Sequence, residues 1–241
     1  MSLKILVTND DGIEADGLKY LAEHAKQYGD VVVVAPKVEQ SAKSHAINIR
    51  TSFECKKVDI FKDVLAYSVD STPADCVRFA KYGLHLDFDI VLSGINKGYN
   101  MGEDIWYSGT VAACFEATNA RAKAIAFSVS KKSPDAYKYF DQVMGYILNN
   151  KLLDYGDIYN VNMPNNAKEI KITKQGGCMF ETTFEETSPS YFFAGGNSIH
   201  DSDINKINYD YVCVENGYIS ITPLTSNRTD ANVYDKLTKI E

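Results

Sequence analysis

The sequence has 241 residues, of which 45% are hydrophobic and 24% are charged, and these fractions exclude global disorder and suit one large domain. Its 25 basic and 32 acidic side chains give a net charge of −7, and no basic run is present. A general affinity for long nucleic acids is therefore not expected, because proteins that bind them neutralise phosphates with a basic surface.

The first half of the chain alternates short apolar runs with segments of helical spacing. Strands are expected over residues 4–8, 31–35, 64–69, 90–92 and 124–129. Helical segments are expected over residues 16–28, 74–84, 108–120 and, as a helix or a loop and helix, 134–149. Continuous apolar runs indicate strands buried on both faces, and their alternation with helices indicates parallel pairing. We therefore predict an α/β fold with a doubly wound, mostly parallel sheet.

The second half is more polar. Further strands are expected over 158–161 and 219–223, whereas 175–208 has the composition of a long hairpin or excursion. Residues 229–240 are expected to form a terminal helix capped by a Thr or Asp. We therefore predict one domain over residues 1–241. Its core is expected over 1–170 and 217–224, with a protruding arm over 175–212 and a tail over 225–241.

The compartment is predicted from features that the sequence lacks. No charged segment followed by a long apolar one opens the chain, and no run of about 18 apolar residues occurs, so neither export nor a membrane span is expected. The five cysteines are scattered and form no C-x-x-C pair, which is typical of reduced thiols. We expect a cytoplasmic protein.

Polar residues follow three of the expected strands, and ligands of open α/β sheets bind at that edge. Asn9-Asp10-Asp11-Gly12 follows the first strand, Ser41 follows the second, and residues 93–102, which are expected to form a loop, follow the fourth. Adjacent carboxylates need solvent, a proton or a cation to offset their repulsion, and hard divalent cations prefer oxygen ligands. The candidate ligands of Mg²⁺ or Mn²⁺ are Asp10, Asp11, Ser41 and Asn96. The alternative is a turn of solvated acids with a glycine at positive φ.

A second candidate site opens the helix expected at 108–120. A helix N-terminus presents free N–H groups to an anion, and the hydroxyls of Ser108 and Thr110 could add donors. Ser108 could equally be only an N-cap. A metal beside such an anion site is the arrangement expected for phosphoryl transfer to water. His45 is the histidine nearest these segments, and its role is left open between contact with substrate and simple solvation.

Other nucleotide and hydrolase motifs are missing. The sequence contains no G-x-x-x-x-G-K-[ST], no G-x-G-x-x-G after the first strand and no G-x-S-x-G. These absences argue against a Walker ATPase, a dinucleotide-binding protein and a serine hydrolase of the elbow type.

Five motifs in the same order resemble the survival-protein-E (SurE) family of metal-dependent 5′-nucleotidases. They are ILVTNDDG at 5–12, VVAPKVEQSA at 33–42, STPADCV at 71–77, SGINKGYNMGEDIWYSGTVAA at 93–113 and GYISITPL at 217–224. The resemblance spans most of the chain. It differs from the family pattern at Ser44, Ser71 and Tyr99, none of which is a candidate metal ligand.

The resemblance implies a Rossmann-like core, one divalent metal ion, Mg²⁺ or Mn²⁺, and hydrolysis of nucleoside 5′-monophosphates; some members also act on 3′-monophosphates and short polyphosphate. It places Asp10, Asp11, Ser41 and Asn96 on the metal. Phosphate-facing positions are Asn100, Ser108, Gly109 and Thr110, and Asn9 of the first motif is expected to bind phosphate or substrate with them. It also implies that the arm exchanges between subunits, giving a homodimer or homotetramer.

Several points remain open at this level. Asp10 or Asp11 could orient or deprotonate an attacking water, or one of them could attack as a nucleophile through an aspartyl-phosphate; we favour water. The competing function is a regulatory nucleotide-binding module without turnover. The aromatic residues Tyr99, Trp106, Tyr107 and those at 191–193 could stack on a base, although arm-to-arm packing is the preferred interpretation for 191–193. The base, the phosphate position and the size of the oligomer are not predicted.

Overall fold

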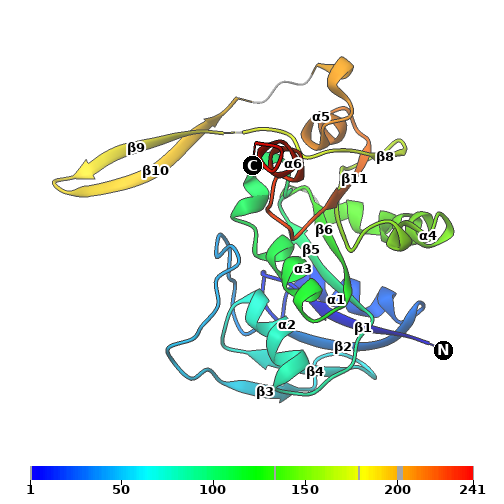
Figure 1. Cartoon of the computed structure of the whole chain (residues 1–241). Coiled ribbons are helices and arrows are strands. Elements are labelled where there is room, and N and C mark those ends of the chain that lie inside the picture. Colours follow the sequence, from blue (N-terminus) through cyan, green and yellow to red (C-terminus); the bar gives the residue numbers. More distant parts are fainter. Residues whose placement is uncertain (1, 133, 179, 200–202, 241) are drawn as a thin grey trace.

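The computed structural model describes residues 2–132, 134–178, 180–199 and 203–240. Within these residues, nine strands form one sheet: β1 (Leu3–Thr8), β2 (Gly29–Pro36), β3 (Cys55–Val58), β4 (Leu65–Val69), β5 (Ile90–Lys97), β6 (Lys123–Val129), β7 (Ile158–Met163), β8 (Ile170–Ile172) and β11 (Ile219–Leu224). Their order is β3-β4-β2-β1-β5-β6-β7-β11-β8 (Figure 1). Only the β3–β4 and β7–β11 pairs are antiparallel. The predicted mostly parallel sheet is confirmed.

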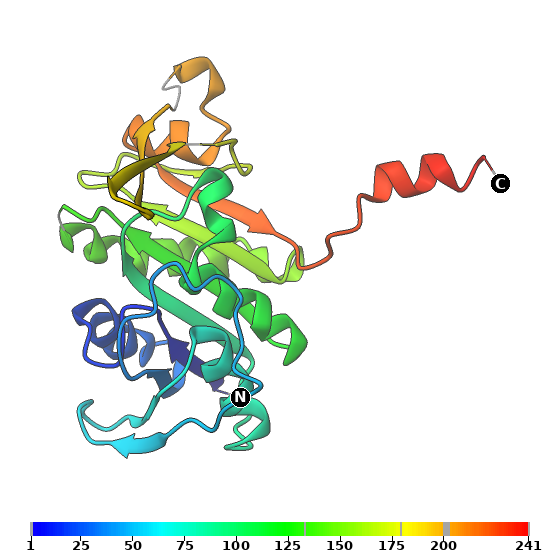
Figure 2. The ribbon, with the colours of Figure 1, turned by 90° about the vertical axis from the view of Figure 1, so that its left-hand side faces the viewer.

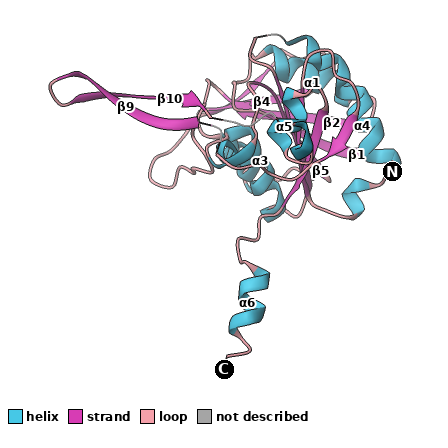
Figure 3. Cartoon of the chain, turned by 90° about the horizontal axis from the view of Figure 1, so that it is seen from above, coloured by secondary structure: helices cyan, strands magenta, loops and turns pink. Residues whose placement is uncertain are grey.

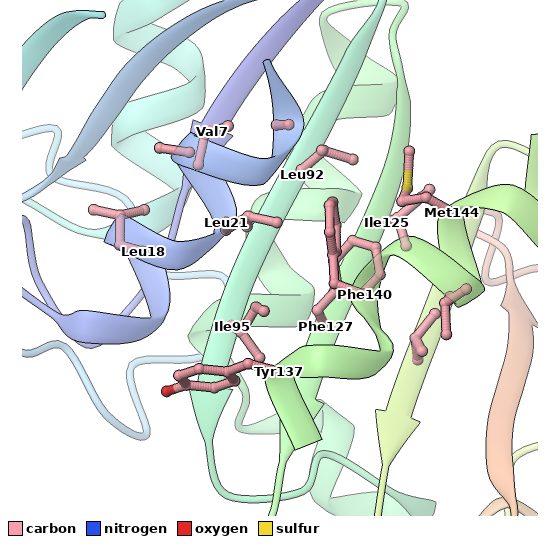
Figure 4. Packing of buried hydrophobic residues seen from close by; sticks show 14 of the residues in the cluster. Val7, Leu18, Leu21, Leu92, Ile95, Ile125, Phe127, Tyr137, Phe140 and Met144 are labelled. Carbon is pink, nitrogen blue, oxygen red and sulfur yellow. The ribbon is translucent and has the colours of Figure 1, made fainter. Parts of the chain in front are cut away.

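Helices cover both faces of this sheet. They are α1 (Asp16–Ala25), α2 (Pro73–Tyr82), α3 (Gly109–Asn119), α4 (Phe140–Asn149) and α5 (Asp210–Glu215), whereas α6 (Ala231–Leu237) lies away from the sheet. Ile5 and Val7 of β1 share one buried cluster with α1 and α4, whereas Leu6 belongs to another cluster with α2 and α3. Figure 4 shows the first of these clusters around the ring of Phe127. The alternation of β1 side chains between two cores is what a doubly wound sheet requires.

Strand β5 is longer than the sequence predicts. Residues 93–97 were expected in a loop, and that expectation is wrong, because pairing with β6 resumes at Asn96 and Lys97 after a register shift. Gly94 permits the shift: its φ is +132°, and a Cβ there would lie 2.4 Å from the carbonyl oxygen of Phe127. Only glycine tolerates that approach. The strand thereby carries Asn96 to the carboxyl edge of the sheet.

Two segments project from the body in different directions (Figures 1–3). One is the antiparallel hairpin of β9 (Phe180–Ser188) and β10 (Tyr191–Ser198), and the other is the C-terminal segment that carries α6. Asp230 caps α6 by accepting a 3.0 Å hydrogen bond from the backbone N–H of Val233. The predicted hairpin and terminal helix are present.

The inner part of the predicted arm differs from the sequence expectation of 175–212. Helix α5 begins inside that range, yet Asp210, Val212 and Cys213 are fully buried, and the helix packs against β11. Its six residues are too few to give a readable helical period, and the four residues of β3 are likewise too few to show a strand pattern. Residues 179 and 200–202 of the predicted arm lie outside the described residues. Among the helices that the structure does describe, none is long and apolar enough to cross a membrane.

Candidate active site

The candidate site lies where the strand order of the sheet reverses. Strand β1 pairs with β2 on one side and with β5 on the other. The chain therefore builds β2, β3 and β4 on one side of β1 and then crosses to the other side to form β5. Ligands of open α/β sheets bind at such a point. Here a pocket of about 530 Å³ is lined by the four candidate ligands and by two candidate phosphate residues: Asp10, Asp11, Ser41, Asn96, Asn100 and Ser108.

Asp10 is a buried carboxylate and not a solvated turn residue. Its exposed fraction is 5%, and Oδ1 accepts a 2.5 Å hydrogen bond from the hydroxyl of Thr110. The pKa of Asp10 is raised to about 6, mainly by burial; the hydrogen bond from Thr110 lowers it and the charge of Asp11 raises it, and the value is the net result. A cation in the pocket would offset both the burial and the repulsion.

Asp11 is less buried and points into the same pocket. The backbone N–H of Lys97 donates to its Oδ2 over 3.3 Å. Burial raises the pKa of Asp11, and the nearby charge of Glu39 raises it as well. The turn that places both acids is held by Asn9, whose amide nitrogen donates to the carbonyl of Gly12 over 2.9 Å. Asn9 is 1% exposed, so it supports the turn from the protein interior.

Ser41 and Asn96 reach the pocket from different elements. The loop that carries Ser41 is joined to the turn of residues 9–12, called the acidic turn below. The N–H of Gln40 donates to the carbonyl of Asp10 over 2.7 Å. The hydroxyl of Ser41 donates to Glu39 over 2.5 Å. Asn96 donates its amide nitrogen to the carbonyl of Gly98 over 2.8 Å, which leaves the amide oxygen as the atom it offers to a cation.

The donor set fits a hard divalent cation. The four candidate ligands that line the pocket supply two carboxylates, one hydroxyl and one amide, and all of them offer oxygen. Across the part of the chain that the structure describes, no three or more His, Cys, Asp or Glu side chains gather as they would around zinc. A cation bound here would therefore need Ser41 and Asn96 in addition to the two acids.

The N-terminus of α3 forms the other wall of the site. Ser108 is its N-cap, and its Oγ accepts from the N–H of Val111 over 3.1 Å. Gly109 lies against the acidic turn, where a Cβ would be 2.8 Å from the Cβ of Asp10. Because Thr110 gives its hydroxyl proton to Asp10, its hydroxyl is not available as a donor to an anion, contrary to the sequence expectation. Its backbone N–H remains at the helix start.

Asn100 is held by a buried polar cluster that the sequence analysis missed. Its carbonyl accepts from the amides of Asn160 over 2.7 Å and Asn162 over 2.9 Å. Its own amide donates to Ser128 over 2.9 Å, and more weakly to Thr110 over 3.4 Å. Two asparagines within the otherwise apolar strand β7 were the signal that could have revealed this cluster.

Two lysines in the pocket were also missed. Lys97 ends β5, and Lys131 follows β6 at the same edge of the sheet. Ligands of open α/β sheets bind beyond the carboxyl ends of the strands, which we call the carboxyl-edge rule. For the strand expected at 124–129, this rule indicates Lys131 as a candidate. These side chains add positive charge to a site that carries two adjacent acids.

His45 lies outside this pocket. Its Nε2 is 2.8 Å from Oε2 of Glu116 on α3, and it lines a neighbouring pocket of about 510 Å³ with Trp106 and Phe115. The two pockets share Ser108. His45 therefore joins the loop after β2 to helix α3 and is not among the residues that line the pocket of Asp10 and Asp11.

Comparisons with known proteins agree with this arrangement. A model of the family described as Survival protein SurE matches residues 5–182. The chain is 38% identical over 249 residues to 5′-nucleotidase SurE of Clostridium botulinum (strain ATCC 19397 / Type A), with 97% of each covered. It is 35% identical over 258 residues to 5′-nucleotidase SurE of Natranaerobius thermophilus, with 99% of each covered. The crystal structure of Sure protein from Aquifex aeolicus superposes with a TM-score of 0.80 at 32% identity, covering 98% of this chain and 99% of that one.

Proposed function

We propose that this chain, which belongs to the Survival protein SurE family, is a divalent-metal-dependent phosphatase that hydrolyses nucleoside 5′-monophosphates to a nucleoside and phosphate. Relatives that match it over nearly their full length carry the name 5′-nucleotidase. The observation that carries the proposal is the buried Asp10 beside Asp11, directly against the N-terminus of α3. The proposed cation site and the proposed anion site would thus share one wall.

The proposed ligands of the cation are Asp10, Asp11, Ser41 and Asn96. When bound, Mg²⁺ or Mn²⁺ supplies a Lewis acid and lowers the pKa of a coordinated water. Thr110 holds Asp10 in one orientation through its 2.5 Å hydrogen bond. The backbone N–H of Lys97 does the same for Asp11. The protein therefore fixes both carboxylates before substrate arrives, which is the preorganisation that catalysis needs.

The substrate phosphate is proposed to bind at the start of α3. The N–H groups of Gly109 and Thr110 and the hydroxyl proton of Ser108 are the donors there. Asn100 and Lys131, which line the same pocket, add an amide and a positive charge. Charge that develops on the phosphoryl oxygens would be stabilised by these groups.

Asp10 or Asp11 is proposed to orient or deprotonate the attacking water, with Asn96 completing the catalytic set. Direct attack by water is preferred over an aspartyl-phosphate, because a carboxylate that binds a metal is a weaker nucleophile. Nucleoside 3′-monophosphates and short polyphosphate are proposed as further substrates. The role of a regulatory module without turnover fits less well, since simple phosphate binding gains nothing from two adjacent carboxylates, one of them buried, beside the anion.

The hairpin of β9 and β10 is proposed to exchange between subunits in a homodimer or homotetramer. Its strands expose Phe184, Phe192 and Phe193 by more than 60% each, and among the described strands β9 and β10 pair only with each other. Large exposed aromatic residues on a projecting hairpin favour burial against a partner. A cytoplasmic location is also proposed, which the five free cysteines support.

The test is phosphate release from AMP, from other mononucleotides and from p-nitrophenyl phosphate, before and after treatment with EDTA. We expect activity to vanish with EDTA and to return with Mn²⁺ or Mg²⁺. Asp11→Asn should abolish turnover while the circular dichroism spectrum and the unfolding midpoint stay close to those of the wild type. A panel without metal-restored activity would contradict the enzyme and favour the regulatory module. Rapid-quench trapping of a phosphorylated aspartate would contradict direct attack by water.

A further inference from the structure

Asp210 is a fully buried carboxylate that the proposed mechanism does not use. It opens helix α5, and its exposed fraction is 0%. Its Oδ2 accepts from the backbone N–H of Gly102 over 2.9 Å. Its Oδ1 accepts from the N–H of Gly176 over 2.9 Å and from that of Tyr211 over 2.8 Å. One side chain therefore holds three backbone groups from separate parts of the chain.

Two of these partners belong to segments with different tasks. Gly102 opens a short 3-10 helix directly after the loop 98–101, which presents Asn100 to the active-site pocket. Gly176 lies at the root of the hairpin of β9 and β10, shortly before β9 begins. The loop and the root also meet directly, because the N–H of Glu103 donates to the carbonyl of Gly177 over 3.2 Å. Asp210 is thus the junction between the hairpin root and the phosphate-facing loop.

Packing reinforces this junction. Met101 of the loop and Val214 of α5 form a small buried cluster, against which Tyr99 and Tyr211 are partly buried. The ring of Tyr211 lies beside Gly176, since a Cβ on that glycine would be 2.3 Å from the ring. Helix α5 therefore contacts both the loop and the hairpin root, through apolar and polar groups.

The loop has little freedom to absorb a shift at Gly102. Its other fixed point is Asn100, whose carbonyl accepts hydrogen bonds from the amides of Asn160 and Asn162 of β7. One residue, Met101, separates Asn100 from Gly102, and Met101 is 4% exposed. A displacement of Gly102 must consequently be passed to Asn100 or strain its hydrogen bonds. Close-packed interiors transmit such shifts and do not absorb them.

We propose that Asp210 is a positioning residue that couples the root of the β9–β10 hairpin to Asn100 in the active-site pocket. The inference rests on the proposed phosphatase function, because it is tested through the hydrolysis of AMP and the binding of inorganic phosphate. A shift of the hairpin root, as on assembly with a second copy of the chain, would pass through Asp210 and Gly102 to the phosphate-binding wall. A merely structural Asp210 would affect stability alone.

Two neighbouring glycines give a matched test. Gly176→Ala places a Cβ 2.3 Å from the Tyr211 ring and 3.0 Å from Oδ1 of Asp210, so the root must separate from the Tyr211 ring and the packing around Asp210 is disturbed. Gly177→Ala meets no atom within 4 Å and keeps its backbone carbonyl, so it is the control. Asp210→Asn is the third variant, because an amide nitrogen would face a backbone N–H in place of an acceptor. All are measured as full-length chains loaded with Mn²⁺.

We expect Gly176→Ala and Asp210→Asn to lower kcat/KM for AMP roughly tenfold or more, since small displacements of a positioning group cost large factors in rate. Inhibition by inorganic phosphate should weaken in parallel, while Gly177→Ala matches the wild type. Circular dichroism well below the unfolding midpoint shows that each variant is folded. Should Gly176→Ala fail to fold, Asp210→Asn provides the same readout.

Two results would overturn parts of this picture separately. The first is an active wild type together with a folded Gly176→Ala variant whose kcat/KM for AMP and inhibition by inorganic phosphate equal those of Gly177→Ala. Asp210 would then not position the loop. The same conclusion follows if Asp210→Asn changes only the unfolding midpoint. If the wild type itself releases no phosphate with any metal, the proposed function fails first.

Discussion

The hydroxyl of Thr110 donates a 2.5 Å hydrogen bond to Oδ1 of Asp10, which lies 100 positions earlier in the chain. Both side chains are buried, and the bond joins the turn after β1 to the first turn of α3. The candidate metal ligand is therefore oriented by the same helix that would receive the phosphate. This link makes the two halves of the proposed site depend on each other.

Thr110→Val tests that dependence. The substitution keeps the side-chain shape but removes the donor, and a hydrogen bond to a buried charged group contributes about 1.5–3 kcal/mol. The Asp10 carboxylate would then be harder to ionise, so we expect weaker Mn²⁺ binding by calorimetry and a matching loss of phosphatase activity. Thr110→Ser retains the hydroxyl and should retain both. Wild-type Mn²⁺ affinity in Thr110→Val would show that the bond does not orient the ligand.

Asp10→Asn should stabilise the metal-free protein while abolishing turnover. In the folded chain the pKa of Asp10 is about 6, above its ordinary value of 3.8. A raised pKa contributes stability that is full below about 3.8 and is lost as the pH rises through about 6. At pH 8 the metal-free protein thus carries a buried ionised group that asparagine lacks, at a cost on the order of 1–3 kcal/mol.

The measurement is thermal unfolding in EDTA at two pH values. We expect the unfolding midpoint of Asp10→Asn to exceed that of the wild type by several degrees near pH 8 and to match it near pH 4, where Asp10 is largely protonated when folded. Asparagine can still accept the bond from Thr110, so the comparison isolates the charge. A lower midpoint for Asp10→Asn near pH 8 would contradict the view that the acidic turn is strained without a cation.

Lys131→Met tests the positive charge at the edge of the pocket. Lys131 is exposed and lines the pocket with Asp10 and Asn100. Removing the charge should raise KM for AMP several-fold with little change in kcat, because a flexible exposed lysine attracts the phosphate in both ground and transition states. Lys132→Met is the control, since Lys132 is exposed but does not line the pocket. Equal KM values for the two variants would remove Lys131 from the site.

The strands and the acidic turn were predictable because their signals are local. Runs such as 31–35 are apolar throughout, and a buried parallel strand needs nothing else to be recognised. The carboxyl-edge rule then collects Asp10, Ser41 and Asn96 without any structure. These three residues do line one pocket.

The remaining features depend on contacts that no local pattern encodes. The course of β5 past Gly94 depends on the carbonyl of Phe127 on a neighbouring strand. The partner of Thr110 lies 100 positions away, and the carboxylate of Asp210 finds Gly102 across 108 positions. Sequence spacing shows which residues follow a strand, whereas it does not show which hydroxyl or backbone group will satisfy a buried charge.

Gly109→Ala tests how closely α3 must approach the acidic turn. A Cβ at this position would lie 2.8 Å from the Cβ of Asp10, 3.1 Å from its Oδ2 and 3.2 Å from Cγ of Pro73. Neither neighbour can yield easily, because Asp10 is buried and Pro73 opens the adjacent helix α2. The helix start must therefore move away from Asp10, which separates the proposed phosphate donors from the proposed metal ligands.

We expect Gly109→Ala to reduce kcat/KM by roughly a hundredfold, the scale found when reacting groups are misplaced by about 1 Å. Overpacking should also lower stability by about 1–3 kcal/mol. The matched control is Gly145→Ala in α4, where a Cβ meets no atom within 4 Å and the gain in helix propensity should raise the unfolding midpoint slightly. Activity is measured with Mn²⁺ well below both midpoints. Full activity in Gly109→Ala would mean that the start of α3 and the acidic turn need not be in contact, and that the phosphate binds elsewhere in the pocket.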